Sequence, residues 1–245
     1  MALPFSLAPV TLVCGHYGVG KTNFALNLAL DAAAEGHDVT LVDLDIVNPY
    51  FRSSEYRRVL EEGGVKLVAP VFAEQGSSLD VPSLTGAIIP ALNRAYFAHC
   101  DDENSKVRVI VDVGGDDAGA TALARFEADI KRGPYEMLCV VNKFRNLTKQ
   151  VGEALEVMDE IEFKSKLQVT GIVSNSHLQA DTDASVVADG VIFAEEVAAF
   201  RKLPIVCVTV PKTLIQQEKD ALTPYATEKV LYPISTVVKK PWELW

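Results

Sequence analysis

The chain has 245 residues, of which 49% are hydrophobic, and its formal net charge is −10. This length suffices for one complete α/β domain, and the acidic surface disfavours nucleic acid and anionic membranes as partners. No apolar run approaches the ~20 residues that span a bilayer, and the N-terminus lacks the pattern of a signal peptide. We therefore expect a cytoplasmic protein with a single domain over residues 1–245, in which residues 225–245 are a candidate C-terminal tail.

Predicted strands and helices alternate along the chain, which indicates a three-layer α/β/α fold with a mostly parallel, doubly wound sheet. Strands are predicted at residues 10–13, 39–43, 65–68, 107–112, 136–141, 167–174 and 204–210. Helices are predicted at residues 22–30, 53–60, 85–98, 118–131, 148–163 and 184–201, and residues 70–84 are predicted to be loop. Ligands bind at the carboxyl ends of the strands in such sheets, so the segments that follow the strands carry the candidate site.

The segment after the first strand fits the phosphate-binding pattern G-x-x-x-x-G-K-[ST] and predicts a P-loop NTPase fold. Glycines permit positive φ angles and let backbone N–H groups approach an anion, and the following helix adds partial positive charge. We expect Lys21 to contact the β- and γ-phosphates and Thr22 to ligate Mg²⁺. The residues expected to bind the nucleotide here are Gly15, His16, Tyr17, Gly18, Val19, Gly20, Lys21, Thr22 and Asn23.

Two acidic segments supply candidate catalytic and metal-binding carboxylates. Asp112 ends an apolar strand, as the Walker B aspartate does, and is expected to hold Mg²⁺ directly or through water. Asp43 and Asp45 are two residues apart, so in extended chain both would point toward one site. A carboxylate beside the γ-phosphate can orient or deprotonate a water. We expect Lys21, Asp45 and Asp112 to be catalytic and Thr22, Asp45 and Asp112 to bind metal; turn formation or loop solvation is the alternative for the carboxylates.

Polar residues after the later strands are candidates for recognising the base. The amide of Asn175 offers a donor and an acceptor that could read a purine edge, and Asn142 could do the same. Ordinary turn chemistry is the alternative for both. Pro211, after the last strand, is a further expected nucleotide contact. Arg145 stands where the guanine-specific N/T-K-x-D motif has an aspartate, and arginine cannot accept a hydrogen bond, so ATP is expected rather than GTP.

These motifs resemble the MinD/ParA/Mrp group of P-loop ATPases, which includes the nitrogenase iron protein and cobyrinic acid amide synthases. The resemblance covers about residues 10–212 and rests on residues 15–22, 27–29, 42–46 and 112–115. It implies Mg-ATP binding, slow hydrolysis and often a homodimer that sandwiches the nucleotide. It also implies that Asp45 is the water-activating switch I aspartate, Asp112 the switch II aspartate and Asn175 the base-contacting asparagine.

The chain departs from this group in several places. His16 replaces the second lysine, which in the group reaches across the dimer to the partner's phosphates. The cysteines are unpaired in spacing, unlike those of metal-binding members. Pro233 and Pro241 interrupt the C-terminal segment, so an unbroken membrane helix is not expected there. Arg52 is either an arginine finger or a solvated residue at a helix start.

Three functions remain open from the sequence. The first is an ATPase that acts as a conformational switch on an unknown protein client. The second is an ATP-dependent carboxylate ligase like dethiobiotin or cobyrinic acid amide synthases, which a metabolite pocket near residues 76–84 would favour. The third is a regulatory module that binds nucleotide without turnover.

Overall fold

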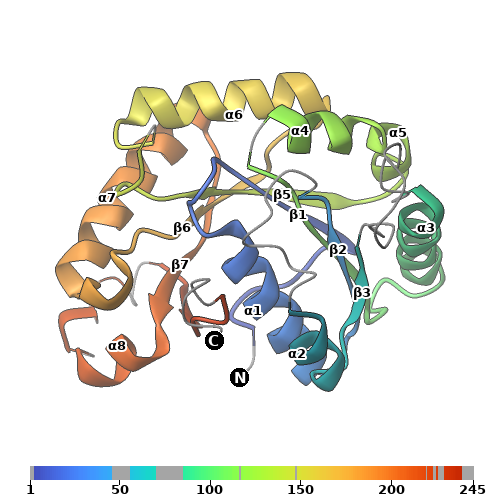
Figure 1. Ribbon diagram of the computed structural model, residues 1–245, viewed down its shortest axis with the longest axis horizontal. Helices are drawn as coiled ribbons and strands as arrows, with labels where there is room; N and C mark the ends of the chain where they lie inside the picture. Colours follow the sequence, from blue (N-terminus) through green and yellow to red (C-terminus); the bar gives the residue numbers. More distant parts are fainter. Residues whose placement is uncertain are drawn as a thin grey trace, which may run out of the picture.

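The computed structural model describes residues 3–45, 56–69, 85–115, 117–146, 148–218, 220–222, 225 and 229–238. Within these residues eight parallel strands form one sheet in the order β3-β2-β4-β1-β5-β6-β7-β8 (Figure 1). The strands are β1 (Val10–Cys14), β2 (Asp38–Asp43), β3 (Lys66–Val68), β4 (Val107–Asp112), β5 (Tyr135–Val141), β6 (Gly171–Ser174), β7 (Ile205–Pro211) and β8 (Leu231–Ile234). Strands β2, β3 and β4 thus lie on one side of β1, and β5, β6, β7 and β8 lie on the other. The strand order therefore reverses at the end of β1, which is the kind of position where ligands bind in such sheets.

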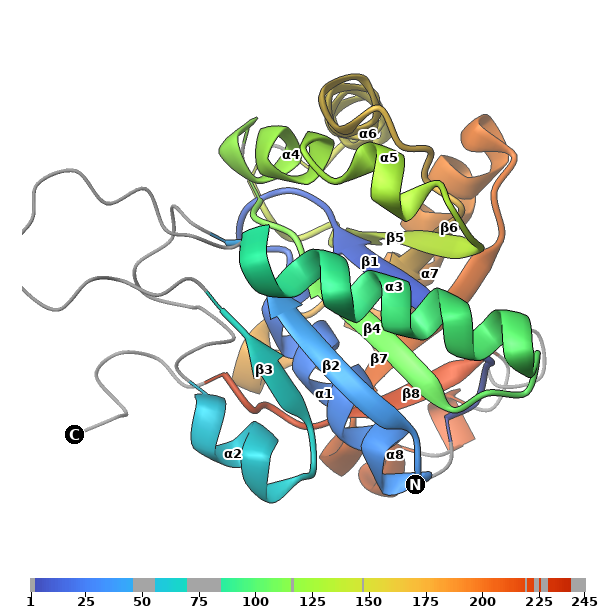
Figure 2. The same ribbon diagram turned by 90° about the vertical axis from the view of Figure 1, so that its right-hand side faces the viewer.

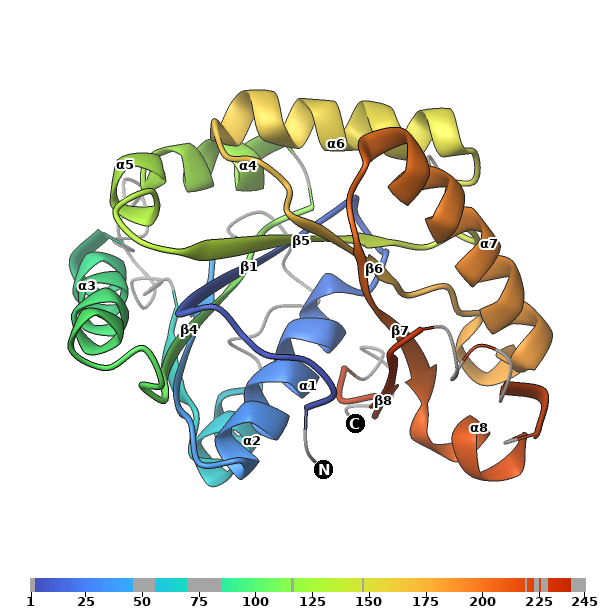
Figure 3. The ribbon, with the colours of Figure 1, turned by 180° about the vertical axis from the view of Figure 1, so that it is seen from behind.

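Helices cover both faces of the sheet and confirm the predicted three-layer α/β/α fold (Figures 1 and 3). The helices are α1 (Lys21–Ala34), α2 (Arg57–Glu62), α3 (Thr85–Asp101), α4 (Asp117–Ala124), α5 (Glu127–Ile130), α6 (Val151–Ser165), α7 (Ala184–Arg201) and α8 (Lys212–Gln217). One face is covered by α1 and α2, and the other by α3, α4, α5, α6 and α7. In Figure 2, α3 lies in front of the sheet, whereas α1 is seen behind β2 and α2 lies at the lower left.

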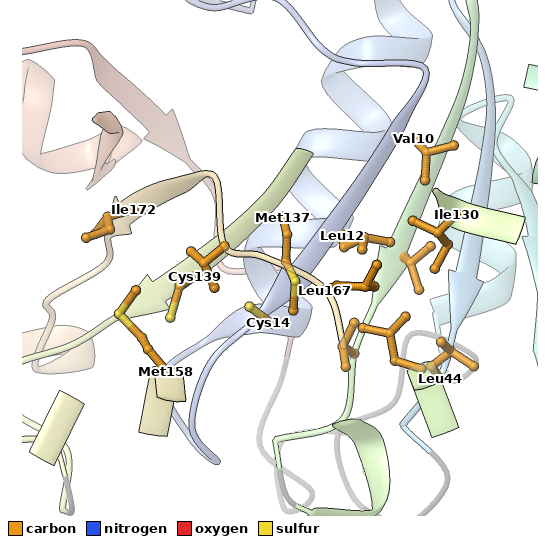
Figure 4. Close-up of a cluster of buried hydrophobic side chains, with 14 of the residues drawn as sticks. Val10, Leu12, Cys14, Leu44, Ile130, Met137, Cys139, Met158, Leu167 and Ile172 are labelled. Atoms are coloured by element: carbon orange, nitrogen blue, oxygen red, sulfur yellow. The ribbon is translucent and has the colours of Figure 1, made fainter. Parts of the chain in front are cut away.

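Alternate side chains of β1 enter the two apolar clusters on either side of the sheet. Leu12 and Cys14 belong to the cluster under α3 to α7, whereas Val13 belongs to the cluster under α1. Figure 4 shows part of the first cluster, in which Cys14 of β1, Cys139 of β5 and Met158 of α6 are among the labelled side chains. Because β1 is buried over its whole length, the loop that follows it starts from a rigid base.

Two elements differ from the sequence prediction because local contacts override the periodic pattern. The helix predicted at residues 118–131 is two helices, α4 and α5, separated by a turn in which Phe126 is buried. The strand predicted from residue 167 begins only at Gly171. Just before it, the Thr170 side-chain hydroxyl accepts a hydrogen bond from the backbone N–H of Met137, 2.9 Å away.

The sequence analysis did not predict β8, which lies within the segment treated as a candidate tail. β8 pairs with β7 at the edge of the sheet, with Pro233 beside Val210. Proline is tolerated on an edge strand because its missing N–H faces away from the ladder. The predicted loop at residues 70–84, the start of the helix predicted at residues 53–60, and Arg52 lie outside the described residues.

No helix in the described part of the chain has both the length and the apolar composition needed to cross a membrane.

Candidate functional site

The phosphate loop runs from the end of β1 to the start of α1 and is shaped by its glycines. Gly15 and Gly20 have φ angles of 138° and 96°. A Cβ atom on Gly15 would lie 2.5 Å from the carbonyl oxygen of Val140, and one on Gly20 would lie 2.4 Å from Nδ2 of Asn175. Both positions therefore require glycine, because a side chain would be strained by φ and would overlap a neighbour.

The N-terminus of α1 opens toward this loop. The first hydrogen bond of the helix runs from the N–H of Phe24 to the carbonyl oxygen of Gly20, at 3.0 Å. The backbone N–H groups of Lys21, Thr22 and Asn23 thus belong to the first turn of the helix, where the N–H groups point toward the end of the helix that faces the loop. Together with the helix dipole, they make this end of α1 suited to an anion.

The structure brings Lys21, Asp45 and Asp112 together at the carboxyl end of the sheet. All three are buried, with exposed fractions of 6%, 6% and 1%. Lys21 Nζ donates a hydrogen bond to the carbonyl oxygen of His16 at 3.0 Å. Burial lowers the pKa of Lys21, and the negative charges of Asp112 and Asp45 act in the opposite direction. The two carboxylates therefore offset only part of the effect of burial, and the pKa of Lys21 remains lowered.

The glycine pair after β4 lies against these charged groups. A Cβ on Gly115 would lie 2.5 Å from Lys21 Nζ and 2.8 Å from the backbone of Tyr17. A Cβ on Gly114 would lie 3.4 Å from Oδ1 of Asp45. The backbone after Asp112 is thus in close contact with the phosphate loop, with Lys21 and with Asp45.

Asp43 has a positioning contact that the residue pattern did not reveal. Its side chain is fully buried, and its Oδ1 accepts a hydrogen bond from the backbone N–H of Asp45 at 3.0 Å. On the neighbouring strand its register partner is Asp112. The sequence analysis expected both carboxylates to point toward one site, whereas one oxygen of Asp43 fixes the backbone that carries Asp45.

Asn175 lies behind the phosphate loop, at the end of β6. Its Nδ2 donates to the carbonyl oxygen of Val19 at 2.7 Å, and its Oδ1 accepts from the hydroxyl of Thr209 on β7. Its side chain is 2% exposed. These contacts hold the loop against the ends of β6 and β7, while a contact to the base stays a prediction.

Asn142 and Ser176 link the ends of β5 and β6. Asn142 is fully buried, and its Oδ1 accepts from the N–H of Phe144 at 3.0 Å, which closes a turn. The hydroxyl of Ser176 accepts from the N–H of Lys143 at 3.0 Å. The turn chemistry that the sequence analysis gave as the alternative for Asn142 is thus present. Pro211 ends β7 and precedes the first turn of α8, where it is partly buried.

Two histidines lie at the phosphate loop, His16 within it and His177 beside it. His16 has its Nδ1 3.1 Å from the carbonyl oxygen of Tyr17, whose own side chain is exposed. His177 lies next to Gly20, since a Cβ there would be 3.4 Å from His177 Nε2. Burial lowers the pKa of His177 to about 4, and the charge of Arg145 acts in the same direction. The sequence predicts a surface or capping position for His177, which has no ligand spacing; its place after β6 was the only signal that it lies beside the loop.

Asn23 makes side-chain contacts away from the phosphate loop. Its Oδ1 accepts from the N–H of Val237 at 2.8 Å, and its Nδ2 donates to the carbonyl oxygen of Ser235 at 3.1 Å. We therefore expect Asn23 to contact the nucleotide through its backbone N–H and not through its side chain.

The oxygen ligands near the loop fit Mg²⁺ by type. Thr22 offers a hydroxyl, and Asp45 and Asp112 offer carboxylates, which are the ligands this ion prefers. The described residues contain no group of three or more His, Cys, Asp or Glu side chains placed to hold a metal on their own.

Comparison with known proteins gives one family and a set of distant folds. Residues 10–186 match the model of the CobQ/CobB/MinD/ParA nucleotide binding domain. Chloroplast FtsY from Physcomitrella patens is 18% identical with a TM-score of 0.53, over 83% of this chain and 59% of that one. FtsY from Mycoplasma mycoides is 19% identical with a TM-score of 0.51, over 85% of this chain and 62% of that one.

A third similar structure is the signal recognition particle receptor FtsY from Elizabethkingia anophelis in complex with GDP. It is 21% identical with a TM-score of 0.48, over 84% of this chain and 58% of that one. The chain thus spans less than two thirds of the length of these proteins, and the likeness to them concerns the fold. The sequence has no significant match among curated proteins.

Proposed function

The chain belongs to the CobQ/CobB/MinD/ParA nucleotide-binding domain family, and from this membership and the geometry of the site we propose that it is an Mg-ATP-dependent ATPase that works as a conformational switch. The observation that carries the proposal is the meeting of Lys21, Asp45 and Asp112 at the open N-terminus of α1. Lys21 begins α1 after the loop that follows β1, whereas Asp45 and Asp112 come from the ends of β2 and β4. Their convergence supplies an anion site, a cation and two carboxylates within one small region.

In the proposed reaction the first turn of α1 and Lys21 hold the phosphates. Lys21 Nζ now rests on the carbonyl oxygen of His16, and a β- or γ-phosphate oxygen would replace this neutral acceptor with a charged one, which forms a stronger hydrogen bond. Thr22, Asp45 and Asp112 would hold Mg²⁺, which supplies charge neutralisation on the phosphates when bound. Asp45 would accept the proton of the water that attacks the γ-phosphate.

The switch in this proposal is the backbone after Asp112. Gly114 and Gly115 lie against Asp45 and Lys21, so binding and loss of the γ-phosphate would change the surroundings of this segment directly. A homodimer belongs to the proposal as well. In it, His16 takes the place of the lysine that related ATPases use across the dimer, and its neighbour Tyr17 is exposed on the same loop.

Phosphate release from Mg-ATP by the purified chain tests this function against its alternatives. We expect slow release that is independent of a panel of small carboxylic acids. Release that requires one of the acids would show a ligase, the alternative that a metabolite pocket near residues 76–84, outside the described residues, would favour. Tight ATP binding without any release would show a module that does not hydrolyse nucleotide.

A further inference from the structure

The side of α1 that faces β8 carries three polar residues at intervals of four. Asn23, Asn27 and Asp31 therefore lie above one another on one face of the helix, and each bonds to the segment Leu231–Val238, which we term the C-terminal strap. In Figures 1 and 3 the end of this segment lies beside α1. The strap is about 200 residues away in sequence from the helix that it contacts.

Two asparagine amides of α1 bind the strap backbone. Asn27 Nδ2 donates to the carbonyl oxygen of Ser235, and the N–H of Ser235 donates back to Asn27 Oδ1, both at 2.8 Å. Asn23 Oδ1 accepts from the N–H groups of Val237 and Val238, at 2.8 and 3.2 Å. The two side chains thus form hydrogen bonds with backbone N–H and carbonyl groups of the strap.

Apolar contacts fix the other part of the strap to the same helix. Tyr232 is 2% exposed and donates a hydrogen bond from its hydroxyl to Oδ2 of Asp31 at 2.9 Å. Its ring meets Phe24 edge-on, with 6.0 Å between the centroids. Ile234, Val237 and Val238 pack on the cluster under α1. The strap is therefore docked along α1 from the first turn to the third.

The strap supplies hydrogen-bond partners to both asparagines. Asn27 is 3% exposed; its Nδ2 also donates to the carbonyl oxygen of Asn23 at 2.8 Å within the helix, and its Oδ1 accepts from the N–H of Ser235 on the strap. Leaving that buried oxygen without its donor is costly, whereas Asn23 is partly buried. Alanine would be the better helix former at either position. The sequence therefore places two poorer helix formers in the first two turns of α1, where their side chains are used by the strap.

We propose that the C-terminal strap is coupled to the phosphate loop through Asn23 and Asn27, which act as positioning residues for the first turn of α1. Asn23 directly follows Thr22; its backbone N–H belongs to the anion-binding turn and its side chain holds Val237 and Val238. A phosphate that fixes the first turn also fixes the asparagine that holds the strap. By linkage, docking of the strap must then favour nucleotide binding to the same extent.

This inference rests on the proposed nucleotide binding, so its test reads the two separately. Hydrogen exchange of the peptides over residues 231–238 is measured in the full chain without nucleotide and with a saturating, non-hydrolysable ATP analogue and Mg²⁺. We expect the analogue to slow exchange at Ser235, Val237 and Val238 several-fold. Calorimetry on the same samples gives the affinity.

Two variants separate positioning from stability. Asn23→Ala should weaken binding of the analogue by roughly tenfold, within the usual range of coupling between sites, and abolish the nucleotide effect on strap exchange. Tyr232→Phe removes a bond of the same strap two turns farther from the loop, so it should lower the melting temperature while changing the affinity less than about twofold.

Three results would overturn the coupling. The first is wild-type protein that binds the analogue while exchange at residues 235–238 is unchanged, a result that leaves the proposed function intact and applies even if the Asn23 variant does not fold. The second is a folded Asn23→Ala protein with wild-type affinity. The third is wild-type protein that binds no nucleotide, which contradicts the proposed function as well.

Discussion

At the scale of single residues, the candidate site contains buried charged groups that interact with one another. Asp43 holds the backbone of Asp45, and the carboxylates of Asp45 and Asp112 offset part of the effect of burial on the pKa of Lys21. A lone buried charge would neutralise instead. The arrangement therefore keeps a lysine and two carboxylates ready for a phosphate and a cation.

Asp45→Asn tests the expected role of Asp45 in hydrolysis. The amide has nearly the same shape as the carboxylate but cannot accept the proton of the attacking water, so phosphate release should fall by ~10²–10⁴-fold. Binding of ATP, measured by calorimetry, should survive. Asp159→Asn, at an exposed carboxylate on α6, is the matched control and should leave release unchanged. Unaltered release in the Asp45 variant would remove Asp45 from the mechanism.

His177 gives a prediction about pH. Its folded pKa of about 4 lies below the ~6.5 of a free histidine. Between these values the unfolded chain binds a proton that the folded chain does not, so the free energy of unfolding falls as the pH is lowered toward about 4. The loss at about pH 5 should be roughly 2 kcal/mol. In urea denaturation, His177→Gln should show a smaller decrease between about pH 7 and 5 than wild type; equal decreases would contradict the burial of a neutral ring.

At the scale of elements, the glycines of the phosphate loop are required for two different reasons: a positive φ angle and a close approach to neighbouring atoms. Gly15 and Gly18 both have positive φ angles, of 138° and 77°, but a Cβ on Gly15 would meet Val140 whereas one on Gly18 would meet nothing within 4 Å. Gly18→Ala should therefore cost about 1 kcal/mol for the left-handed backbone alone. Gly15→Ala should cost more, because strain and overlap add, by about 1–3 kcal/mol.

Urea denaturation of the two variants measures this difference directly. Equal losses of stability would mean that the close approach between Gly15 and β5 does not exist in solution.

The elements that sequence reasoning predicted well are those with a strong pattern of their own. β1, β4 and α1 have long apolar or periodic runs, and the glycine and lysine spacing between β1 and α1 predicted the loop that the structure shows. β8 was missed because Pro233 argues against a strand when the edge position is unknown. The break between α4 and α5 was missed because no glycine or proline marks it.

At the scale of the whole molecule, the contacts that sequence reasoning missed join distant segments. The separation between Asn27 and Ser235 is 208 residues, and that between Asn175 and Val19 is 156 residues. Periodicity reports which face of an element is buried but does not report its partner. The sequence therefore indicated that Asn23 and Asn175 lie near the site, while only the fold shows that Asn23 holds the strap and Asn175 holds the loop.

The family and the fold together make a nucleotide switch the simplest account of the whole chain. The sheet of parallel strands brings the side chains of the candidate site to one end of the strands. The strap connects this end to the C-terminal part of the chain through its contacts with Asn23. We propose that the base is recognised near the ends of β5 and β6, where Arg145 stands in the place of the aspartate of the guanine-specific motif.

Calorimetry of Mg-ATP and Mg-GTP with the wild-type chain and with Lys21→Ala tests this account most directly. The account predicts that wild type binds ATP more tightly than GTP. It also predicts that Lys21→Ala weakens ATP binding by at least about a hundredfold, since a buried charged partner of the phosphates is lost. Lys106→Ala, at an exposed lysine, is the control and should bind as wild type does. Wild-type affinity in the Lys21 variant, or tighter binding of GTP than of ATP, would contradict the account.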